Sequence, residues 1–358
     1  MSKKPAPTIL SVFDPRANAL NAIRLALALL VIVWHSFPLS GSQVSSAPLK
    51  QLLGETAVDS FFAISGFLIL GSWLRNPQWS RYIAARVLRI FPAFWACLVV
   101  TAFVLAPLAT MITTGLNYGA TLSLENATYV LKNAGLRIFQ PLIDGTPIGV
   151  PYPFAWNGSL WTLWWEFLCY LGILALGVIG LLRRRWVIPG LFLLATASLI
   201  PTAYGTVDNF YAESAARFGV MFLAGATLRI YAHRIPLAWP IVAIALAVAL
   251  ASMLLPDYRI VGALPLAYGV FGLGALIKTP KLHFTHDLSY GTYIYAFPVQ
   301  QVLASLRVYE WSFVGYVILS MGSTLILAAA SWFLIERRAM RLRPHRPSST
   351  PLLEHSRG

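Results

Sequence analysis

The sequence predicts an all-α integral membrane protein with about ten transmembrane helices and both termini in the cytoplasm. Of its 358 residues, 58% are hydrophobic and only 11% are charged, whereas soluble domains carry roughly 25% charged residues. About ten segments are also apolar over the ~20 residues that a membrane helix needs. The composition therefore excludes soluble folds, and it excludes disorder, which requires low hydrophobicity.

Apolar runs divide the chain into three predicted parts. Residues 1–18 are polar and basic and form a cytoplasmic segment. The run that follows lacks a signal-peptide cleavage site, so we expect one transmembrane domain over residues 19–335. Residues 336–358 form a short basic cytoplasmic tail. Within the domain we expect membrane helices at about 19–38, 57–74, 90–113, 158–181, 186–203, 211–230, 236–255, 260–277, 288–306 and 311–335.

One connection, about residues 114–157, is much longer than the others. It is rich in Gly, Pro, Asn and Thr and ends in Pro151-Tyr152-Pro153. Long loops of this kind usually have a function. Alternation of the helices places it outside the cell, so we expect an extracytoplasmic cap that influences specificity.

The basic residues predict the orientation of the chain. The sequence holds 27 Lys and Arg against 13 Asp and Glu, a net charge of +14. In a soluble protein this charge would suggest nucleic acid, but in a membrane protein it reports topology. With the N-terminus inside, the outer segments hold only a few basic residues, namely Lys50, Lys132, Arg137, Arg259 and Arg307. We therefore predict cytoplasmic termini, contact with membrane lipid and no nucleic-acid partner.

Arg24 and His35 are two ionisable residues on the first predicted helix. They are eleven positions apart, so they share one helix face and lie about 16 Å apart along the axis. Charged groups at membrane depth are costly and usually functional. The alternative is that Arg24 reaches back to the cytoplasmic interface and that His35 is an ordinary polar residue near the outer one.

Asp59 opens the second helix from the outside, ahead of Ser65-Gly66. A buried carboxylate here is a candidate for the reaction site. The alternative is structural, because Asp59 can act as an N-terminal carboxylate on the helix dipole. Ser65-Gly66 allows another helix to approach closely.

Four arginines follow within fifteen residues in what we expect to be a cytoplasmic loop: Arg75, Arg81, Arg86 and Arg89. Guanidinium groups suit phosphates, so a phosphorylated cytoplasmic ligand is one interpretation. Anionic lipid head groups are the other.

Glu166 lies about 12 Å into the fourth helix, next to Trp161, Trp164 and Trp165. A carboxylate at this depth needs a partner, and Arg217, His35 and a substrate hydroxyl are the candidates. The tryptophans could bind substrate or anchor the helix at the interface.

Three smaller features complete the inventory of ionisable and sulfur groups. Glu213 and Arg217 are spaced to pair with each other on the sixth helix. Cys97 and Cys169 lie in apolar runs and are expected to be buried hydrophobic residues. No spacing predicts a metal site.

Several of these motifs resemble the acyltransferase 3 family when taken in order. They are Arg24 and His35 with ten residues between them, and the stretches 61–68, 86–92 and 159–166. The segments 289–295 and 335–338 extend the resemblance over about residues 16–340. Members are bacterial membrane O-acyltransferases that modify carbohydrates. The resemblance implies a ten-helix domain in the cytoplasmic membrane that uses acyl-CoA, usually acetyl-CoA, as its co-substrate and a glycan or glycolipid as its acceptor.

The resemblance also implies roles for particular residues. His35 would be catalytic with Arg24 as its motif partner, and Arg86 and Arg89 would lie near the donor. Glu166 would match the family's fourth-helix acid. Tyr293 belongs to the 289–295 motif, and we predict that it binds substrate.

The chain departs from the family pattern at two points. Ala296 stands where many relatives have a histidine. Some relatives carry a fused extracytoplasmic domain, for which this chain has no room, so we expect it to act alone or with a separate partner.

The implied mechanism places the donor phosphates on the cytoplasmic arginines and the thioester at His35. His35 would act as general base or accept the acyl group covalently, and Glu166 or Asp59 would orient His35 or the sugar. The alternative function is a proton-coupled secondary transporter, since buried Arg, His, Asp and Glu also occur in carriers. Against it, the sequence has no visible inverted repeat. The sequence does not name the acceptor, the acyl chain or the oligomeric state.

Overall fold

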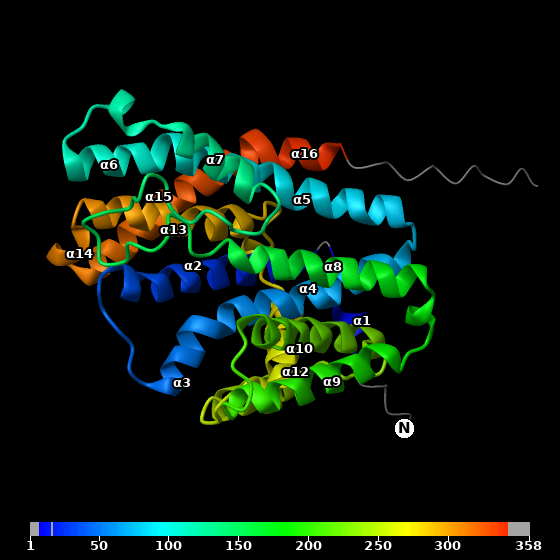
Figure 1. Cartoon of the computed structure of the whole chain (residues 1–358). Helices are drawn as coiled ribbons and strands as arrows, with labels where there is room; N and C mark the ends of the chain where they lie inside the picture. The colour runs from blue at the N-terminus through cyan, green and yellow to red at the C-terminus, as the bar shows by residue number, and fades with distance from the viewer. Residues whose placement is uncertain (1–6, 16, 343–358) are drawn as a thin grey trace, which may run out of the picture.

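The computed structural model describes residues 7–15 and 17–342, and its regular elements are helices (Figure 1). Each of the ten predicted segments overlaps a helix, so the all-α fold class is confirmed. The main helices are α2 (Leu20–Leu39), α4 (Thr56–Arg75), α5 (Trp79–Val100), α6 (Ala106–Thr114), α7 (Leu124–Asn133), α8 (Trp161–Val178), α9 (Val187–Ala203), α10 (Phe210–Tyr231), α11 (Trp239–Ser252), α12 (Arg259–Leu276), α13 (Ser289–Ser305) and α15 (Phe313–Ser331). Four short helices accompany them: α1 (Ile9–Val12), α3 (Ala47–Lys50), α14 (Val308–Trp311) and α16 (Arg337–Arg341).

Single π-helical turns join several of these helices into longer rods. The turn Gln51–Glu55 connects α3 to α4, Thr101–Leu105 connects α5 to α6, and Trp332–Glu336 connects α15 to α16. Residues 1–6, Arg16 and 343–358 lie outside the described residues. The predicted cytoplasmic segments 1–18 and 336–358 are therefore described only in part.

Six helical stretches among the described residues are long and apolar enough to cross a membrane. They are Leu20–Leu39, Ala47–Arg75, Trp79–Thr114, Trp161–Val178, Arg259–Leu276 and Phe313–Arg341, and α9 and α11 are shorter apolar helices. The remaining two predicted spans, α10 and α13, carry more polar side chains. The protein is thus a multi-pass membrane protein, while the number of ten crossings and the orientation of the termini stay predictions.

The polar composition of α13 has a packing explanation. This helix lies between α2 and α15, and 16 of its 17 residues are buried. A helix that faces protein on all sides does not need the apolar surface of one that faces lipid. Its glutamines find partners inside the bundle: Gln300 donates to the Ile32 carbonyl at 3.0 Å.

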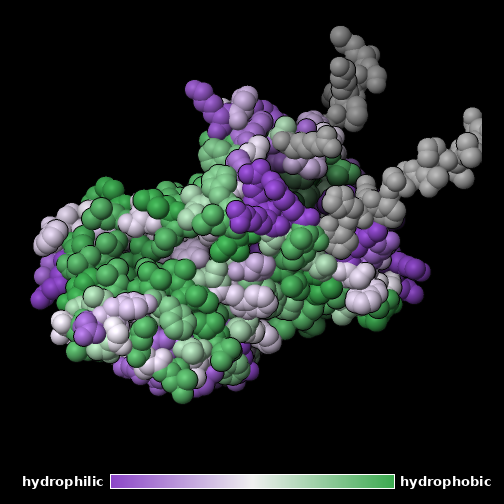
Figure 2. Space-filling model, turned by 90° about the horizontal axis from the view of Figure 1, so that it is seen from above, coloured by the Kyte–Doolittle hydropathy of each residue, from purple (hydrophilic) through white to green (hydrophobic). Residues whose placement is uncertain are grey.

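The surface of the protein is suited to lipid. Figure 2 shows a broad hydrophobic surface with hydrophilic residues gathered mainly toward its edges. Many large apolar side chains of the described residues are exposed, including Val104 on the π-turn after α5, Ile244 on α11, and Ile318 and Ile326 on α15. Exposed apolar area on this scale is typical of a membrane-facing surface and not of a soluble monomer.

Helices α4 and α10 cross at very short distance because each contributes a glycine. A methyl carbon added to Gly66 would lie 1.9 Å from the Phe222 carbonyl oxygen, and one added to Gly225 would lie 1.8 Å from the Ala63 carbonyl oxygen. Neither helix can carry a side chain at these positions without moving the other backbone. The expectation that Ser65-Gly66 permits close helix approach is confirmed, and the contact fixes Ser65 at the site described below.

Two expectations about loops are wrong. The predicted arginine loop contains only residues 76–78, because α5 begins at Trp79, so Arg81, Arg86 and Arg89 lie on a helix. The positions of Tyr82, Arg86 and Arg89 repeat at helical spacing and form one face, and hydropathy alone does not show this. Arg259, predicted in an outer loop, is the first residue of α12 and only 3% exposed.

The segment 114–157 is more ordered than its composition suggests. It contains α7, which lies beside α5 and the π-turn Thr101–Leu105 (Figure 1). Asn126 on α7 is buried and donates to the Ala102 carbonyl at 2.6 Å. At the far end of the segment, Gln301 of α13 donates to the carbonyl oxygens of Tyr152 and Ala155 at 2.9 and 2.8 Å. These contacts hold the segment against the helices and place its last residues near the start of α8.

Candidate functional site

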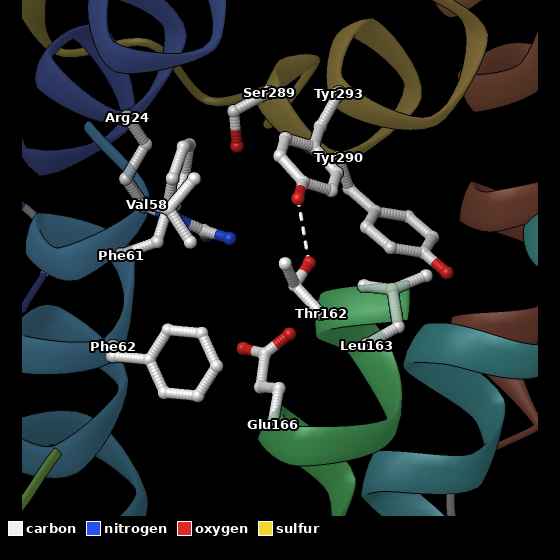
Figure 3. Close-up of a pocket in the computed structure, with 10 residues that line it drawn as sticks. All are labelled: Arg24, Val58, Phe61, Phe62, Thr162, Leu163, Glu166, Ser289, Tyr290 and Tyr293. Atoms are coloured by element: carbon white, nitrogen blue, oxygen red, sulfur yellow. Dashed lines mark hydrogen bonds between the residues drawn. The ribbon is translucent and has the colours of Figure 1, made fainter. Parts of the chain in front are cut away.

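Two adjoining cavities lie along α2, and we name them after the α2 residue that lines each. The Arg24 chamber lies between α2, α4, α8 and α13 (Figure 3). It is lined by Arg24, Val58, Phe61, Phe62, Thr162, Leu163, Glu166, Ser289, Tyr290 and Tyr293. Counting space open to solvent, it holds about 390 Å³.

Glu166 enters the Arg24 chamber from α8 (Figure 3). Its Oε1 accepts hydrogen bonds from the Ser65 hydroxyl at 2.9 Å and from the Tyr170 hydroxyl. The expectation that Arg217 or His35 pairs with this carboxylate is wrong, since two hydroxyls take that role. The other oxygen, Oε2, has no hydrogen bond to a described residue and is available to a ligand.

Arg24 belongs to a chain of ion pairs at the same end of the bundle. The Asp287 carboxylate accepts from both Arg24 and Arg89, and Arg89 also donates to Glu336 at 3.1 Å. Four elements are joined here: α2, α5, the loop before α13, and the π-turn after α15. Burial opposes ionisation of Asp287, but the two guanidinium groups hold the pKa of its carboxyl below the usual range.

Asp287 and Glu336 were not among the predicted site residues. The sequence places Asp287 at the start of the predicted helix 288–306, where its spacing to Ser289 is typical of a helix N-terminus. It lies just before α13 and accepts from the Ser289 hydroxyl at 2.5 Å and from the Ser289 amide at 3.2 Å. Nothing in its position along the chain indicates that arginines 198 and 263 residues away complete the cluster.

The His35 chamber lies beyond the Arg24 chamber along α2. It is lined by Val31, Trp34, His35, Gly54, Glu55, Val58, Gly158, Ser159, Trp161, Thr162, Arg217, Phe218 and Tyr293. It holds about 660 Å³, again counting space open to solvent. Aromatic walls with a few ionisable groups are typical of a site for a polar organic ligand. Arg24 and His35 therefore lie on the same side of α2, and each lines its own cavity.

His35 is held by aromatic packing and not by a carboxylate. Its ring lies 5.1 Å from the Phe297 ring, edge to face, and Gly158 packs against the other part of Phe297, where an added methyl carbon would lie 2.7 Å from Cε2. Nδ1 of His35 is buried and has no partner among the described residues. The hydroxyl of Ser159 in the same chamber is likewise buried and unpartnered within that part of the chain. Buried polar groups without partners are uncommon, and both of these belong to residues that line the His35 chamber.

Tyr293 stands at the boundary of the two chambers. Val58, Thr162 and Tyr293 line both of them. The Tyr293 hydroxyl lies 2.6 Å from the Thr162 hydroxyl (Figure 3) and donates to the Ser159 carbonyl at 3.0 Å. This bond ties α13 to α8 at the point where a molecule would pass from one chamber to the other.

Asp59 lies in a buried ionic cluster and lines neither chamber. It is fully buried and accepts from Tyr258 at 2.6 Å, Arg259 at 2.7 Å and Arg217 at 3.3 Å. Because α3 and the π-turn precede α4 without a break, Asp59 is not at a free helix N-terminus, and its expected dipole role is wrong. Arg217 pairs with Asp59, so the expected Glu213–Arg217 pair is also wrong.

The four predicted donor arginines have different surroundings. Arg89 is engaged by Asp287 and Glu336, and the Arg86 guanidinium lies 5.0 Å from the Tyr82 ring centroid. Arg86 Nε is buried and unpartnered among the described residues. Arg81 is half-buried on α5, and Arg75 is exposed at the end of α4, where it lines a separate groove.

The three tryptophans of α8 also have different surroundings. Trp161 lines the His35 chamber and packs against Phe218 at 5.4 Å between ring centroids. Trp165 packs on Phe218 at 6.3 Å and lines neither chamber, and Trp164 lies half-buried against the core. No group of three or more His, Cys, Asp or Glu side chains that could bind a metal occurs within residues 7–15 and 17–342.

Comparison with known proteins places this arrangement among acyltransferases. A family model described as an acyltransferase domain, of the acyltransferase 3 type, matches residues 17–333. An O-acetyl transferase of Shigella phage Sf6 is 29% identical over 339 residues, which cover 90% of this chain and 96% of that protein. Nodulation protein 10 of Rhizobium leguminosarum bv. viciae is 29% identical over 362 residues, covering 91% and 94%. No solved structure matches the chain.

Proposed function

The chain belongs to the acyltransferase 3 family, and we propose that this membrane O-acyltransferase moves an acetyl group from cytoplasmic acetyl-CoA to a glycan or glycolipid hydroxyl. The acceptor would lie at the outer face of a bacterial cytoplasmic membrane. One observation carries the proposal: the Arg24 and His35 chambers adjoin along α2 and share Thr162 and Tyr293 as lining residues. A donor and an acceptor that approach from opposite sides of a membrane need such a route.

The donor would enter at the Arg24 end. The phosphates of CoA would lie near Arg75, Arg81 and Arg86, whose guanidinium groups are not neutralised by a carboxylate within the described residues. Arg89 would hold the entrance together through Asp287 and Glu336. The pantetheine arm would extend through the Arg24 chamber toward His35, a distance of about 16 Å along α2.

The transfer step would take place in the His35 chamber. His35 takes the proton of the acceptor hydroxyl as general base, and the oxygen attacks the carbonyl carbon of the thioester. A C–O bond forms, the carbonyl electron pair moves to its oxygen, and collapse of this intermediate breaks the C–S bond. The CoA thiolate leaves and takes the proton back from His35. The alternative is that His35 first accepts the acyl group covalently and then passes it to the hydroxyl.

The acceptor would be held by aromatic and ionisable side chains. Trp34 and Trp161 line the His35 chamber, and their flat faces suit the apolar side of a sugar ring. Glu55, which is 30% exposed, is placed to bind a sugar hydroxyl. Glu166 would bind the donor in the neighbouring chamber or stabilise its arm. A partner protein on the outer side would present or receive the glycan.

Labelled acetyl-CoA supplied to inverted membrane vesicles tests the proposal. The vesicles come from cells that carry the gene and from cells in which it is deleted, and mass spectrometry follows the label in the lipid and glycan fractions. We expect labelled O-acetyl groups on glycan only when the gene is present. Label that stays in CoA and acetate in both preparations would contradict acetyl-CoA as the donor. Label that appears in a fraction without carbohydrate would contradict a glycan as the acceptor.

A further inference from the structure

Arg217 is an ionisable residue of the His35 chamber that the preceding mechanism does not use in the reaction. It enters the chamber from α10, and its side chain is 19% exposed. The guanidinium carbon lies 5.1 Å from the Phe218 ring centroid. A cation at membrane depth is costly, so a residue in this position is expected to act on a ligand or a neighbouring charge.

The guanidinium is anchored from one side only. Nε donates to Oδ1 of Asp59 at 3.3 Å, and neither terminal nitrogen bonds to any residue of the described chain. The terminal nitrogens are also not enclosed by protein atoms. Two N–H-bearing nitrogens of a fixed cation are therefore left to the cavity that His35 lines.

Pairing with Asp59 does not by itself explain Arg217. The Oδ2 atom of Asp59 already accepts from Tyr258 at 2.6 Å and from Arg259 at 2.7 Å. Arg259 is buried and also pairs with Glu55 and Asp257. Arg259 is thus shared by three carboxylates, and Arg217 adds a second cation to this cluster. The bond to Asp59 engages only Nε, however, and fixes the direction of the Arg217 side chain without using its terminal nitrogens.

We propose that Arg217 is a further catalytic residue, which stabilises the oxyanion formed when the acceptor hydroxyl attacks the thioester carbonyl. The assignment rests on the proposed function. As the C–O bond forms, the carbonyl electron pair becomes a negative charge on oxygen, and the free N–H groups of Arg217 donate to it. The charge disappears when the C–S bond breaks, so Arg217 neither gains nor loses a proton. A preorganised donor that meets developing charge away from bulk water is the most effective form of such stabilisation.

Arg217→Met and Arg217→Lys test this role in inverted vesicles, with labelled acetyl-CoA as the donor and the membrane's own glycan as acceptor. Loss of one oxyanion donor typically lowers kcat by ~10²–10³-fold. We expect a loss of that size for Arg217→Met, a KM for acetyl-CoA within about threefold of wild type, and partial recovery when guanidinium chloride is added at millimolar concentration. Arg217→Lys keeps the positive charge but not the planar set of N–H donors of the guanidinium group, and we expect kcat to fall at least about tenfold.

Glu213→Gln is the matched control, because Glu213 lies one turn earlier on α10 and is exposed. It should leave transfer unchanged. Transfer by Arg217→Met within fivefold of wild type would overturn the assignment, and so would a raised KM with unchanged kcat, which indicates binding alone. If Arg217→Met does not fold, full activity of folded Arg217→Lys would overturn it as well. Absence of transfer by the wild-type protein would instead contradict the proposed function, and with it this role.

Discussion

Replacing Asp287 by Asn should destabilise the Arg24 end of the bundle strongly. The substitution keeps the shape of the side chain but removes the negative charge that Arg24 and Arg89 share. Arg89 retains Glu336 at 3.1 Å, whereas no other ion pair holds Arg24 among the described residues. Breaking a buried pair by removing one partner costs ~3–5 kcal/mol. With side chains of Asp287, Arg89 and Arg24 that are 12%, 18% and 22% exposed, we expect the lower end, about 3 kcal/mol.

The pH dependence of this contribution has a definite sign. The pKa of Asp287 lies below its usual range in the folded protein. Its stabilisation is therefore complete at pH 7, falls progressively as the pH drops from the ordinary carboxyl pKa to the lowered pKa of the folded protein, and is absent below that. The Asn variant should lack the stabilisation at every pH, so the two stability curves should converge in strong acid.

The free energy of unfolding in mixed detergent micelles, titrated with sodium dodecyl sulfate, measures this difference. Glu310→Gln is the control, because it removes a carboxylate that pairs with Arg307 on the exposed surface, and exposed pairs contribute little. It should not change the midpoint. A loss below about 1 kcal/mol for Asp287→Asn, or equal effects of the two variants, would refute the role of Asp287 as the shared partner.

Two further substitutions test the helix crossing and the chamber boundary. Gly66→Ala should destabilise the protein by ~1–3 kcal/mol or more, because its methyl carbon would lie 1.9 Å from a carbonyl oxygen of α10. The control is Gly172→Ala on α8, whose added methyl carbon meets no atom within 4 Å and should be tolerated. Equal melting temperatures of the two variants in detergent would contradict the close crossing of α4 and α10. Tyr293→Phe and Thr162→Val each break the hydrogen bond between the two hydroxyls at the chamber boundary. A double-mutant cycle on the transfer rate should therefore give a coupling energy of ~1 kcal/mol, about fivefold in rate. Additive effects of the two substitutions would show that this bond does not matter for transfer.

The sequence alone predicts the helical segments and several of the residues that line the two chambers, among them Arg24, His35 and Glu166. Apolar runs mark the helices because lipid demands them, and the spacing of Arg24 and His35 places both on one face whatever they contact. Glu166 is singled out by its depth in an apolar segment, and the structure places it in the wall of the Arg24 chamber. These predictions need only local periodicity and the cost of burying charge.

The rest of the site depends on contacts between distant segments. Asp287 looks like a helix cap, and its pairing with Arg24 and Arg89 requires the bundle to be assembled. Arg259 looks like a loop residue until Asp59 is brought against it. The start of α5 is hidden because its arginines lower the local hydropathy, although they lie on a regular helix face. For Asp287 and Arg259, a charge partner far along the chain decides the structure.

The account depends most on His35 as the residue that activates the acceptor. Acetyl transfer from labelled acetyl-CoA to glycan, measured with His35→Ala and wild-type protein at equal amounts in the same inverted vesicles, tests this directly. Removal of a general base typically lowers the rate by ~10²–10⁴-fold. We predict a loss in that range, with binding of acetyl-CoA retained. Transfer by His35→Ala within a few-fold of wild type would contradict the account.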